Sequence, residues 1–163
     1  MNPEEKRVNP VKKLVTIIIS FALVAGILFV LSLFKGPLKA SSSENFTFAQ
    51  NFNEIRDVCY VDGLKAAGKY QIIDIPEKEE LLALGSDATA EYTIIGITDE
   101  AFQGEAQIEE VIIPVTVTYI GENAFDGCSG ITKVTYKGTK EEWEKIDIQN
   151  GNDCLTNVTV TYE

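Results

Sequence analysis

Two segments of this sequence match each other at a spacing of 23 residues. ITDEAFQG at residues 97–104 aligns with IGENAFDG at residues 120–127, and the match continues through Val111 and Val134. Six of the fifteen positions from 97 to 111 are identical, and all six are apolar or glycine. A repeat of this length is typical of a solenoid, in which each unit exposes an apolar face that only its neighbour can bury.

The residues within one unit indicate how its chain runs. Short β-rich runs surround Val111 and Val134, and they fit parallel strands stacked from one coil to the next. Gly104 and Gly127 permit the tight corners that return the chain. The Ala-Phe pair of each unit supplies one small and one large side chain for a narrow core. The repeat therefore predicts a stack of coils with parallel strands.

The second unit carries a specific family signature. IGENAFDGCSGITKVTY, preceded by VIIPVTVTYIG, resembles the BspA-like leucine-rich repeat, whereas the first unit departs from that pattern at Thr98 and Glu105. The resemblance covers residues 92–163. It implies an α/β fold, a short leucine-rich-repeat solenoid with parallel strands. It also implies a bacterial cell-surface protein that acts in adhesion or protein binding rather than in catalysis.

The end of the sequence predicts a helix-strand cap for this solenoid. Thr139 and Glu142 form a capping box, and the short helix that follows places Trp143 and Ile146 on one face. Trp143 is expected to close the stack, with ligand stacking as the alternative. Residues 157–163 alternate strictly between apolar and polar, so they predict a strand.

Residues 46–91 match no repeat, and we interpret them as an N-terminal cap region of the same domain. Residues 69–75 predict a strand that Pro76 stops, and residues 79–84 predict a short helix. A helix that covers the open end of the stack is also predicted from the spacing of four residues: Phe48, Phe52, Ile55 and Cys59.

The first 45 residues read as a membrane anchor and a linker. Residues 14–34 carry no charge, and as a helix they would span roughly 31 Å, close to the thickness of a bilayer core. Lysines and arginines are more frequent before this run than after it, which places residues 1–13 in the cytoplasm and the remainder outside. Residues 35–45 are rich in Gly, Pro and Ser and predict a stalk. A cleaved signal peptide is the alternative.

Composition excludes several classes of function. The chain has no histidine, which excludes Ser-His-Asp and Cys-His catalysis and every metal site that needs histidine. Residues 41–163 carry eight Lys/Arg against 23 Asp/Glu, a balance of −15, which argues against nucleic acid as a partner. Cys128 is expected to be a small buried hydrophobe, and a disulfide from it to Cys154 or Cys59 stays open.

These features predict a single-pass membrane protein that displays a binding or adhesion module outside the cell. We assign no catalytic residue, cofactor or metal site. The expected partners are the membrane and an extracellular protein or envelope component. Two alternatives remain: a carboxylate-dependent extracytoplasmic hydrolase or its accessory subunit, and a structural or regulatory membrane component. Candidate partner-binding residues on the strand face of the repeats are expected to be exposed: Glu109, Ile112, Thr132 and Thr135.

Overall fold

A computed structural model describes four ranges of the 163-residue chain: residues 36–42, 44–50, 58–83 and 87–163. The chain divides into two units, Met1–Gly36 and Pro37–Glu163, and the described strands and helices all lie in the second. The predicted cytoplasmic segment and membrane helix at residues 1–34 lie outside the described ranges. Within those ranges, no helix is both long enough and apolar enough to cross a membrane.

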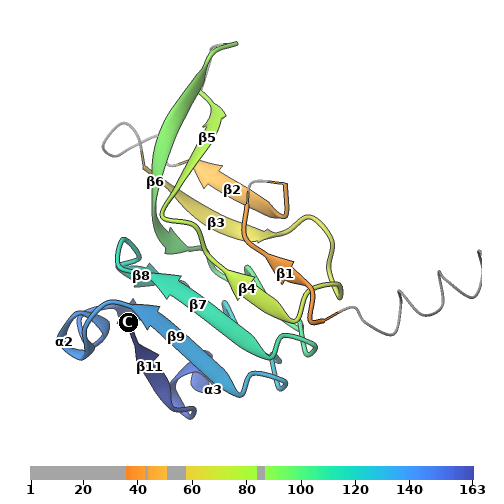
Figure 1. Cartoon of the computed structure of the whole chain (residues 1–163), viewed down its shortest axis with the longest axis vertical. Coiled ribbons are helices and arrows are strands. Elements are labelled where there is room, and N and C mark those ends of the chain that lie inside the picture. Colours follow the sequence, from red (N-terminus) through yellow and green to blue (C-terminus); the bar gives the residue numbers. More distant parts are fainter. Residues whose placement is uncertain (1–35, 43, 51–57, 84–86) are drawn as a thin grey trace, which may run out of the picture. The chain divides into compact units, whose positions relative to one another are not determined.

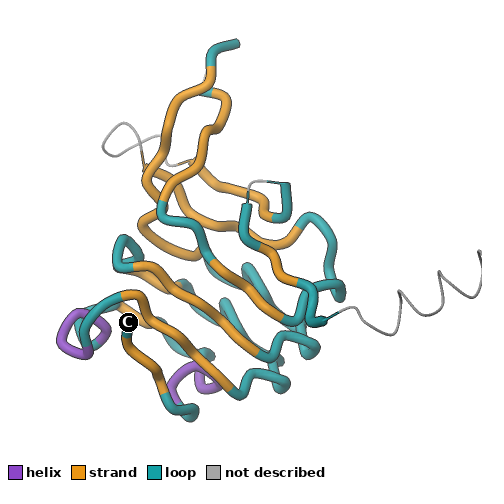
Figure 2. Tube along the Cα trace, viewed as in Figure 1, coloured by secondary structure: helices purple, strands orange, loops and turns teal. Residues whose placement is uncertain are grey.

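The second unit is built from two sheets (Figures 1 and 2). The five-stranded sheet consists of neighbouring parallel strands in the order β1 (Lys39–Ala40), β4 (Ile72–Asp74), β7 (Glu110–Pro114), β9 (Lys133–Lys137) and β11 (Val160–Tyr162). The six-stranded sheet runs β10 (Asp147–Ile148), β8 (Tyr119–Ile120), β6 (Thr89–Ile97), β3 (Val58–Leu64) and β2 (Phe46–Gln50), with β5 (Lys78–Leu82) paired to β6.

From β6 to β11 the chain alternates between the two sheets, one strand in each. Pairing among these six strands is parallel throughout, as the repeat predicts. Each antiparallel pair, β2 with β3 and β5 with β6, includes at least one strand of the segment that matches no repeat. The repeat region is therefore a stack of coils, each with one strand in each sheet. The non-repeating segment adds antiparallel strands to the six-stranded sheet.

Three phenylalanines stack through the core along the coils. The rings of Phe102 and Phe125 are nearly parallel, with centroids 4.9 Å apart and an interplanar angle of 25°. Phe46 of β2 meets Phe102 edge to face at 6.3 Å. All three side chains are fully buried. Two of these rings occupy equivalent repeat positions, which confirms that the phenylalanine of each unit fills the core; of the alanines before them, Ala124 is fully buried and Ala101 is half-buried.

The corners between strands repeat as closely as the core does. Gly104 and Gly127 adopt φ values of 77° and 74°, a left-handed backbone conformation that side chains disfavour. The two corners are also hydrogen bonded: the Phe102 amide donates to the Ala124 carbonyl at 2.8 Å, and the Gly104 amide to the Asp126 carbonyl at 2.7 Å. The predicted role of both glycines is confirmed.

The predicted capping box is present at the start of α2 (Lys140–Trp143). The Glu142 amide donates to the Thr139 hydroxyl at 3.2 Å, and the Thr139 amide donates to the Glu142 carboxylate at 2.9 Å. Trp143 meets the ring of Tyr136 edge to face, with centroids 5.5 Å apart. The helix thus begins where its side chains satisfy the free backbone amides.

The strand predicted at residues 157–163 is present as the shorter β11. Val160 and Tyr162 of β11 pair in register with Val134 and Tyr136 of β9, so the apolar alternation continues the inner face of the five-stranded sheet. A short helix, α3 (Asp153–Thr156), precedes it and was not predicted. It follows Gly151, whose φ of 81° turns the chain.

The two helices predicted between residues 46 and 91 are wrong where the structure describes them. Phe48 and Cys59 lie in strands β2 and β3, while residues 51–57 lie outside the described ranges. The helix predicted at residues 79–84 is replaced by strand β5, in which half-buried and exposed side chains alternate. Pairing of β2 with β3, and of β3 and β5 with β6, imposes a period of two that these segments also fit, and it overrides their weak helical spacing.

One of two further predictions, a strand at residues 69–75 and a stalk at residues 35–45, is confirmed. The predicted strand at residues 69–75 is present as the shorter β4. The expected flexible stalk at residues 35–45 contributes a strand instead, because Lys39–Ala40 form β1 and pair with β4. Ala40 is fully buried, so this part of the expected linker is built into the fold.

Removing one ring of the phenylalanine column should destabilise the domain strongly. Phe125→Ala deletes a fully buried side chain and leaves a cavity, so we expect a loss of about 3–5 kcal/mol in the free energy of unfolding. Trp143 is the single tryptophan, and its fluorescence can follow guanidinium unfolding of the full chain in mild detergent. The control, Tyr162→Ala, truncates an aromatic ring that is 37% exposed and should cost less than about 1 kcal/mol. Equal losses would contradict a core built on this column.

Candidate functional site

The outer face of the five-stranded sheet, here called the strand face, carries three rows of side chains. Cα pairing places Lys39, Ile72, Glu110 and Lys133 in the first row, and Asp74, Ile112, Thr135 and Thr161 in the second. Pro114 and Lys137 form the third. Residues between these rows, such as Val111 and Val134, point into the core and are fully buried. The strand face therefore combines lysines, carboxylates and two isoleucines, of which Ile112 is on the central strand.

Asp74 links three strands of this face. Its carboxylate lies 2.6 Å from the Lys39 Nζ of β1 and 2.9 Å from the Lys137 Nζ of β9. Strand β7 lies between β4 and β9, so Lys137 reaches across one strand to make this contact. The Asp74 side chain is only 15% exposed, whereas those of Lys39 and Lys137 are 45% and 36% exposed. A partner at this face would meet the ammonium groups before the carboxylate.

Opposing effects set the pKa of Asp74. Burial, the largest single effect, acts to raise it, but the hydrogen bonds and positive charges of Lys39 and Lys137 together outweigh burial, and the pKa of Asp74 lies below its ordinary value of 3.8. The carboxylate is therefore ionised near neutral pH and holds both lysines.

A second ion pair lies in the first row. The Lys133 ammonium is 2.6 Å from the Glu110 carboxylate of the neighbouring strand. The Thr135 hydroxyl donates to the same carboxylate at 3.2 Å. Each of the three lysines in these rows thus contacts one of two carboxylates, so the rows carry a slight positive balance although the domain as a whole is strongly acidic.

The structure brings the four predicted partner-binding residues together on β7, β9 and the residues that precede these strands. Ile112 and Thr135 are paired neighbours, and Ile112 is half-buried. Glu109 and Thr132 are exposed, and the Thr132 amide donates to the Glu109 carbonyl at 3.0 Å. The expectation that Thr135 is exposed is wrong: it is 2% exposed, because it is packed between neighbouring strands and bonded to Glu110.

Sequence reasoning missed the charged part of the strand face. Lys133 and Lys137 flank Val134 and Tyr136, and alternation along a strand puts both lysines outward once the apolar pair points inward. That signal was available in the repeat. Lys39 and Asp74 gave no comparable signal, because they lie outside the repeat and meet only through the pairing of β1 and β4.

The cysteines do not form a reactive site. All three are free thiols. Burial is the main cause that raises the pKa of Cys128 to about 12 and that of Cys59 to about 11. The Cys128 thiol donates to the Phe102 carbonyl at 3.0 Å, and the Cys154 thiol to the Phe125 carbonyl at 3.2 Å. Cys128 is 1% exposed, which confirms its predicted burial.

The Asn-rich turn before α3 has a structural role. Asn152 is 3% exposed; its amide oxygen accepts from the Phe125 amide at 3.0 Å, and its amide nitrogen donates to the Gly121 carbonyl at 2.9 Å. These bonds tie the last coil to the preceding corner. In the part of the chain that the structure describes, no group of three or more Cys, Asp or Glu residues is placed to hold a metal ion.

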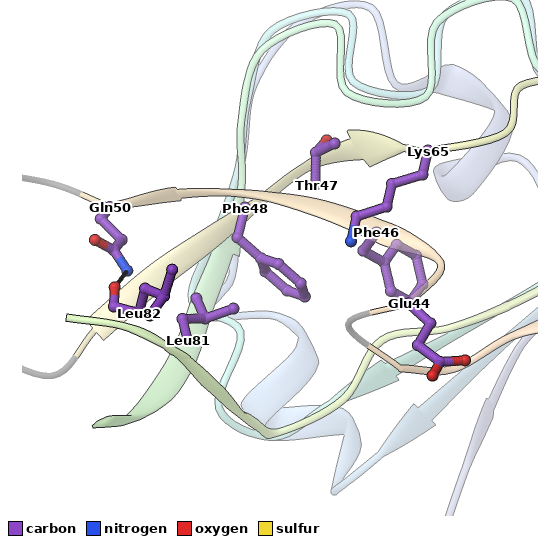
Figure 3. A pocket seen from close by; sticks show the side chains of 8 residues that line it. All are labelled: Glu44, Phe46, Thr47, Phe48, Gln50, Lys65, Leu81 and Leu82. Atoms are coloured by element: carbon purple, nitrogen blue, oxygen red, sulfur yellow. Dashed lines mark hydrogen bonds between the residues drawn. The ribbon is translucent and has the colours of Figure 1, made fainter. Parts of the chain in front are cut away.

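Away from the strand face, an open groove of about 500 Å³ lies between β2 and β5. Phe48 points toward Leu81 across it (Figure 3), and the Gln50 side chain donates to the Leu82 carbonyl at 3.1 Å. Its lining mixes apolar and charged side chains: Glu44, Phe46, Thr47, Phe48, Gln50, Lys65, Leu81 and Leu82. A smaller hollow of about 150 Å³ lies beside α2 and includes Tyr136, Glu142 and Lys145. None of the predicted partner-binding residues lines either hollow.

Residues 86–160 match the family model of the BspA type leucine rich repeat region (6 copies). This region belongs to the BspA-type leucine-rich-repeat family. The paired sheets, the phenylalanine column and the repeated corners described above are how the region folds in this chain. No curated protein sequence matches the chain.

Solved structures of leucine-rich-repeat proteins resemble the BspA-type domain in fold. A leucine rich cell surface protein from Faecalibacterium prausnitzii aligns with 78% of the chain at 20% identity and a TM-score of 0.53. The T. pallidum leucine rich repeat protein aligns with 59% of the chain at 18% identity and a TM-score of 0.43. A leucine-rich repeat protein from Bacteroides capillosus aligns with 73% of the chain at 17% identity and a TM-score of 0.47. The chain spans 42% of the T. pallidum protein and 32% of the F. prausnitzii protein.

Asp74→Asn should destabilise the strand face. The amide cannot hold two ammonium groups, so we expect a loss of about 1–2 kcal/mol in the free energy of unfolding near neutral pH. Because the folded pKa of Asp74 lies below 3.8, its contribution is present above that pH. The difference between wild type and variant should shrink as the pH falls through the lowered pKa.

Asp126→Asn is the matched control, because Asp126 is exposed and its carboxylate accepts a long hydrogen bond of 3.4 Å from the Gln103 side chain, with no lysine in contact among the described ion pairs. Guanidinium unfolding at a series of pH values, followed by Trp143 fluorescence, measures both variants. A pH-independent loss in Asp74→Asn would show that its effect is not the loss of the charged bridge.

Proposed function

We propose that this chain is a membrane-anchored protein that displays its BspA-type domain outside the cytoplasm and binds another protein through the strand face. The observation that carries the proposal is the composition of that face. A half-buried isoleucine, Ile112, stands among side chains whose charges are already paired. Apolar contact at the centre with polar groups around it is the usual arrangement of a protein interface.

Burial and ion pairing on the strand face indicate which residues would contact the partner. Glu109, Ile112 and Thr132 remain candidates, whereas Thr135 is too deeply buried to make more than a small contact. Lys133 and Lys137 join them, because both ammonium groups are accessible from solvent. Their ion pairs with Glu110 and Asp74 hold these long side chains in place, which lowers the entropy lost on binding.

Two observations support a location at the cell surface. The uncharged run at residues 14–34 is long enough to span a bilayer, and the lysines and arginines before it favour a cytoplasmic N-terminus. The F. prausnitzii protein that shares this fold is a leucine rich cell surface protein. No observation favours the hydrolase alternative: Glu110 is engaged with Lys133, and Glu142 with the start of α2.

Ile112→Arg should abolish partner binding while the domain stays folded. The substitution places a charge at the centre of the strand face, where an apolar contact is expected. Leu82→Arg is the matched control, because Leu82 is 64% exposed and lies on β5 of the other sheet. The full chain, immobilised by a tag, is tested for retention of envelope fractions and extracellular matrix proteins. Wild type and Leu82→Arg should retain a protein that Ile112→Arg loses; retention of the same proteins by all three would contradict the strand face as the site.

The proposed topology has a separate test. An epitope tag placed after Glu163 should be removed by protease added to intact bacterial cells that express the chain, and the chain should fractionate with the membrane. Permeabilised cells provide the reference for complete digestion. A tag that is protected until cells are permeabilised would refute display outside the cytoplasm, and a chain released into the medium would indicate cleavage of the apolar segment instead.

A further inference from the structure

The outer face of the six-stranded sheet carries two tyrosines that meet across a glycine. Cα pairing aligns Tyr60 of β3, Gly96 of β6, Tyr119 of β8 and Asp147 of β10 in one row. A Cβ atom on Gly96 would lie 2.8 Å from Cδ1 of Tyr60, so the Tyr60 ring lies over the glycine. It thereby reaches Tyr119 two strands away, with ring centroids 6.4 Å apart in an edge-to-face arrangement. Both tyrosines are half-buried.

Three exposed carboxylates surround this tyrosine pair. Asp62 lies two residues after Tyr60 on the same side of β3 and accepts a hydrogen bond from the Thr98 hydroxyl at 2.8 Å. Asp99 accepts from the Glu122 amide at 2.8 Å, and its negative charge acts on the Tyr119 side chain. Asp147 is the strand neighbour of Tyr119. None of the ion pairs among the described residues includes any of the three.

The titration of Tyr119 agrees with this geometry. Burial, followed by the negative charges of Asp99 and Asp147, raises the pKa of Tyr119. Both carboxylates therefore act on the phenol from nearby. On the strand face the carboxylates contact lysines, whereas here Asp62 accepts a hydrogen bond from a hydroxyl and Asp99 from a backbone amide.

We propose that this face, made of Tyr60, Tyr119, Asp62, Asp99 and Asp147, binds a basic segment of a partner protein. Lysine and arginine fit both of its chemistries. Their aliphatic stems pack against aromatic rings, their cationic groups are attracted to those rings, and their N–H groups bond to carboxylates. The balance of −15 on residues 41–163 would also steer a basic partner toward the domain. This surface is separate from the strand face, so it extends the proposed function and does not depend on it.

A fluorescent octalysine peptide tests the proposal by anisotropy titration of the full chain in mild detergent. The triple variant Asp62→Asn, Asp99→Asn, Asp147→Asn keeps side-chain shape and removes three charges, and it should weaken binding by about tenfold or more. Tyr60→Leu keeps apolar bulk and removes one ring, and it should weaken binding by about threefold. Trp143 fluorescence and circular dichroism confirm that each variant is folded.

The matched control is a second triple variant, Asp87→Asn, Asp126→Asn, Asp153→Asn, which changes the net charge equally at exposed positions away from this face. It should bind octalysine within about twofold of wild type at moderate salt, because distant exposed charges are screened. Equal weakening by both triple variants would show that overall charge alone attracts the peptide and would overturn the site. The site is also overturned if wild type fails to bind octalysine, or if octaglutamate or a neutral oligosaccharide binds more tightly than octalysine.

Discussion

The contact between successive coils is the interaction on which this domain depends. One coil alone has an apolar face that it cannot bury, and the ring of Phe125 is covered because Phe102 lies against it at 4.9 Å. Backbone hydrogen bonds between equivalent corner positions hold the same two coils in register. Phe46 continues the column from a strand outside the repeat, so the non-repeating segment closes the core that the repeat leaves open.

How far the sequence predicts this fold depends on where each residue finds its partner. Phe125, Gly127 and the Thr139–Glu142 capping box act through contacts with a repeat neighbour or within a few residues, and the sequence placed all of them correctly. The strands β2, β3 and β5 are stabilised by pairing with other strands, β3 with the distant β6, and such pairing is not visible in their own local spacing, which suggested helices. Thr135 was misjudged for the same reason, since its burial comes from neighbouring strands and not from its own.

The two sheets present different chemistry to solvent. On the strand face, Asp74 and Glu110 are shielded by lysines, which leaves a surface of paired charges around Ile112. On the six-stranded sheet, Gly96 has no side chain, so the Tyr60 ring can lie over it and meet the Tyr119 ring. Exposed carboxylates lie beside this pair. Because each coil contributes one strand to each sheet, the same repeat builds both surfaces. Under the two proposals made above, the domain would bind two unlike partners on separate surfaces, and occupancy of one would leave the other open.

Equivalent corners are bonded to each other through backbone atoms, as in the bond from the Gly104 amide to the Asp126 carbonyl. These corner bonds use backbone groups only, so they do not depend on side-chain identity, whereas the core between the coils depends on the stacked phenylalanines. A duplicated coil would find its hydrogen bonds, its glycine corner and its ring partner already matched on both sides. The domain can therefore lengthen in whole units of 23 residues without a redesigned core, while an insertion of any other length inside a coil must bulge outward as a loop.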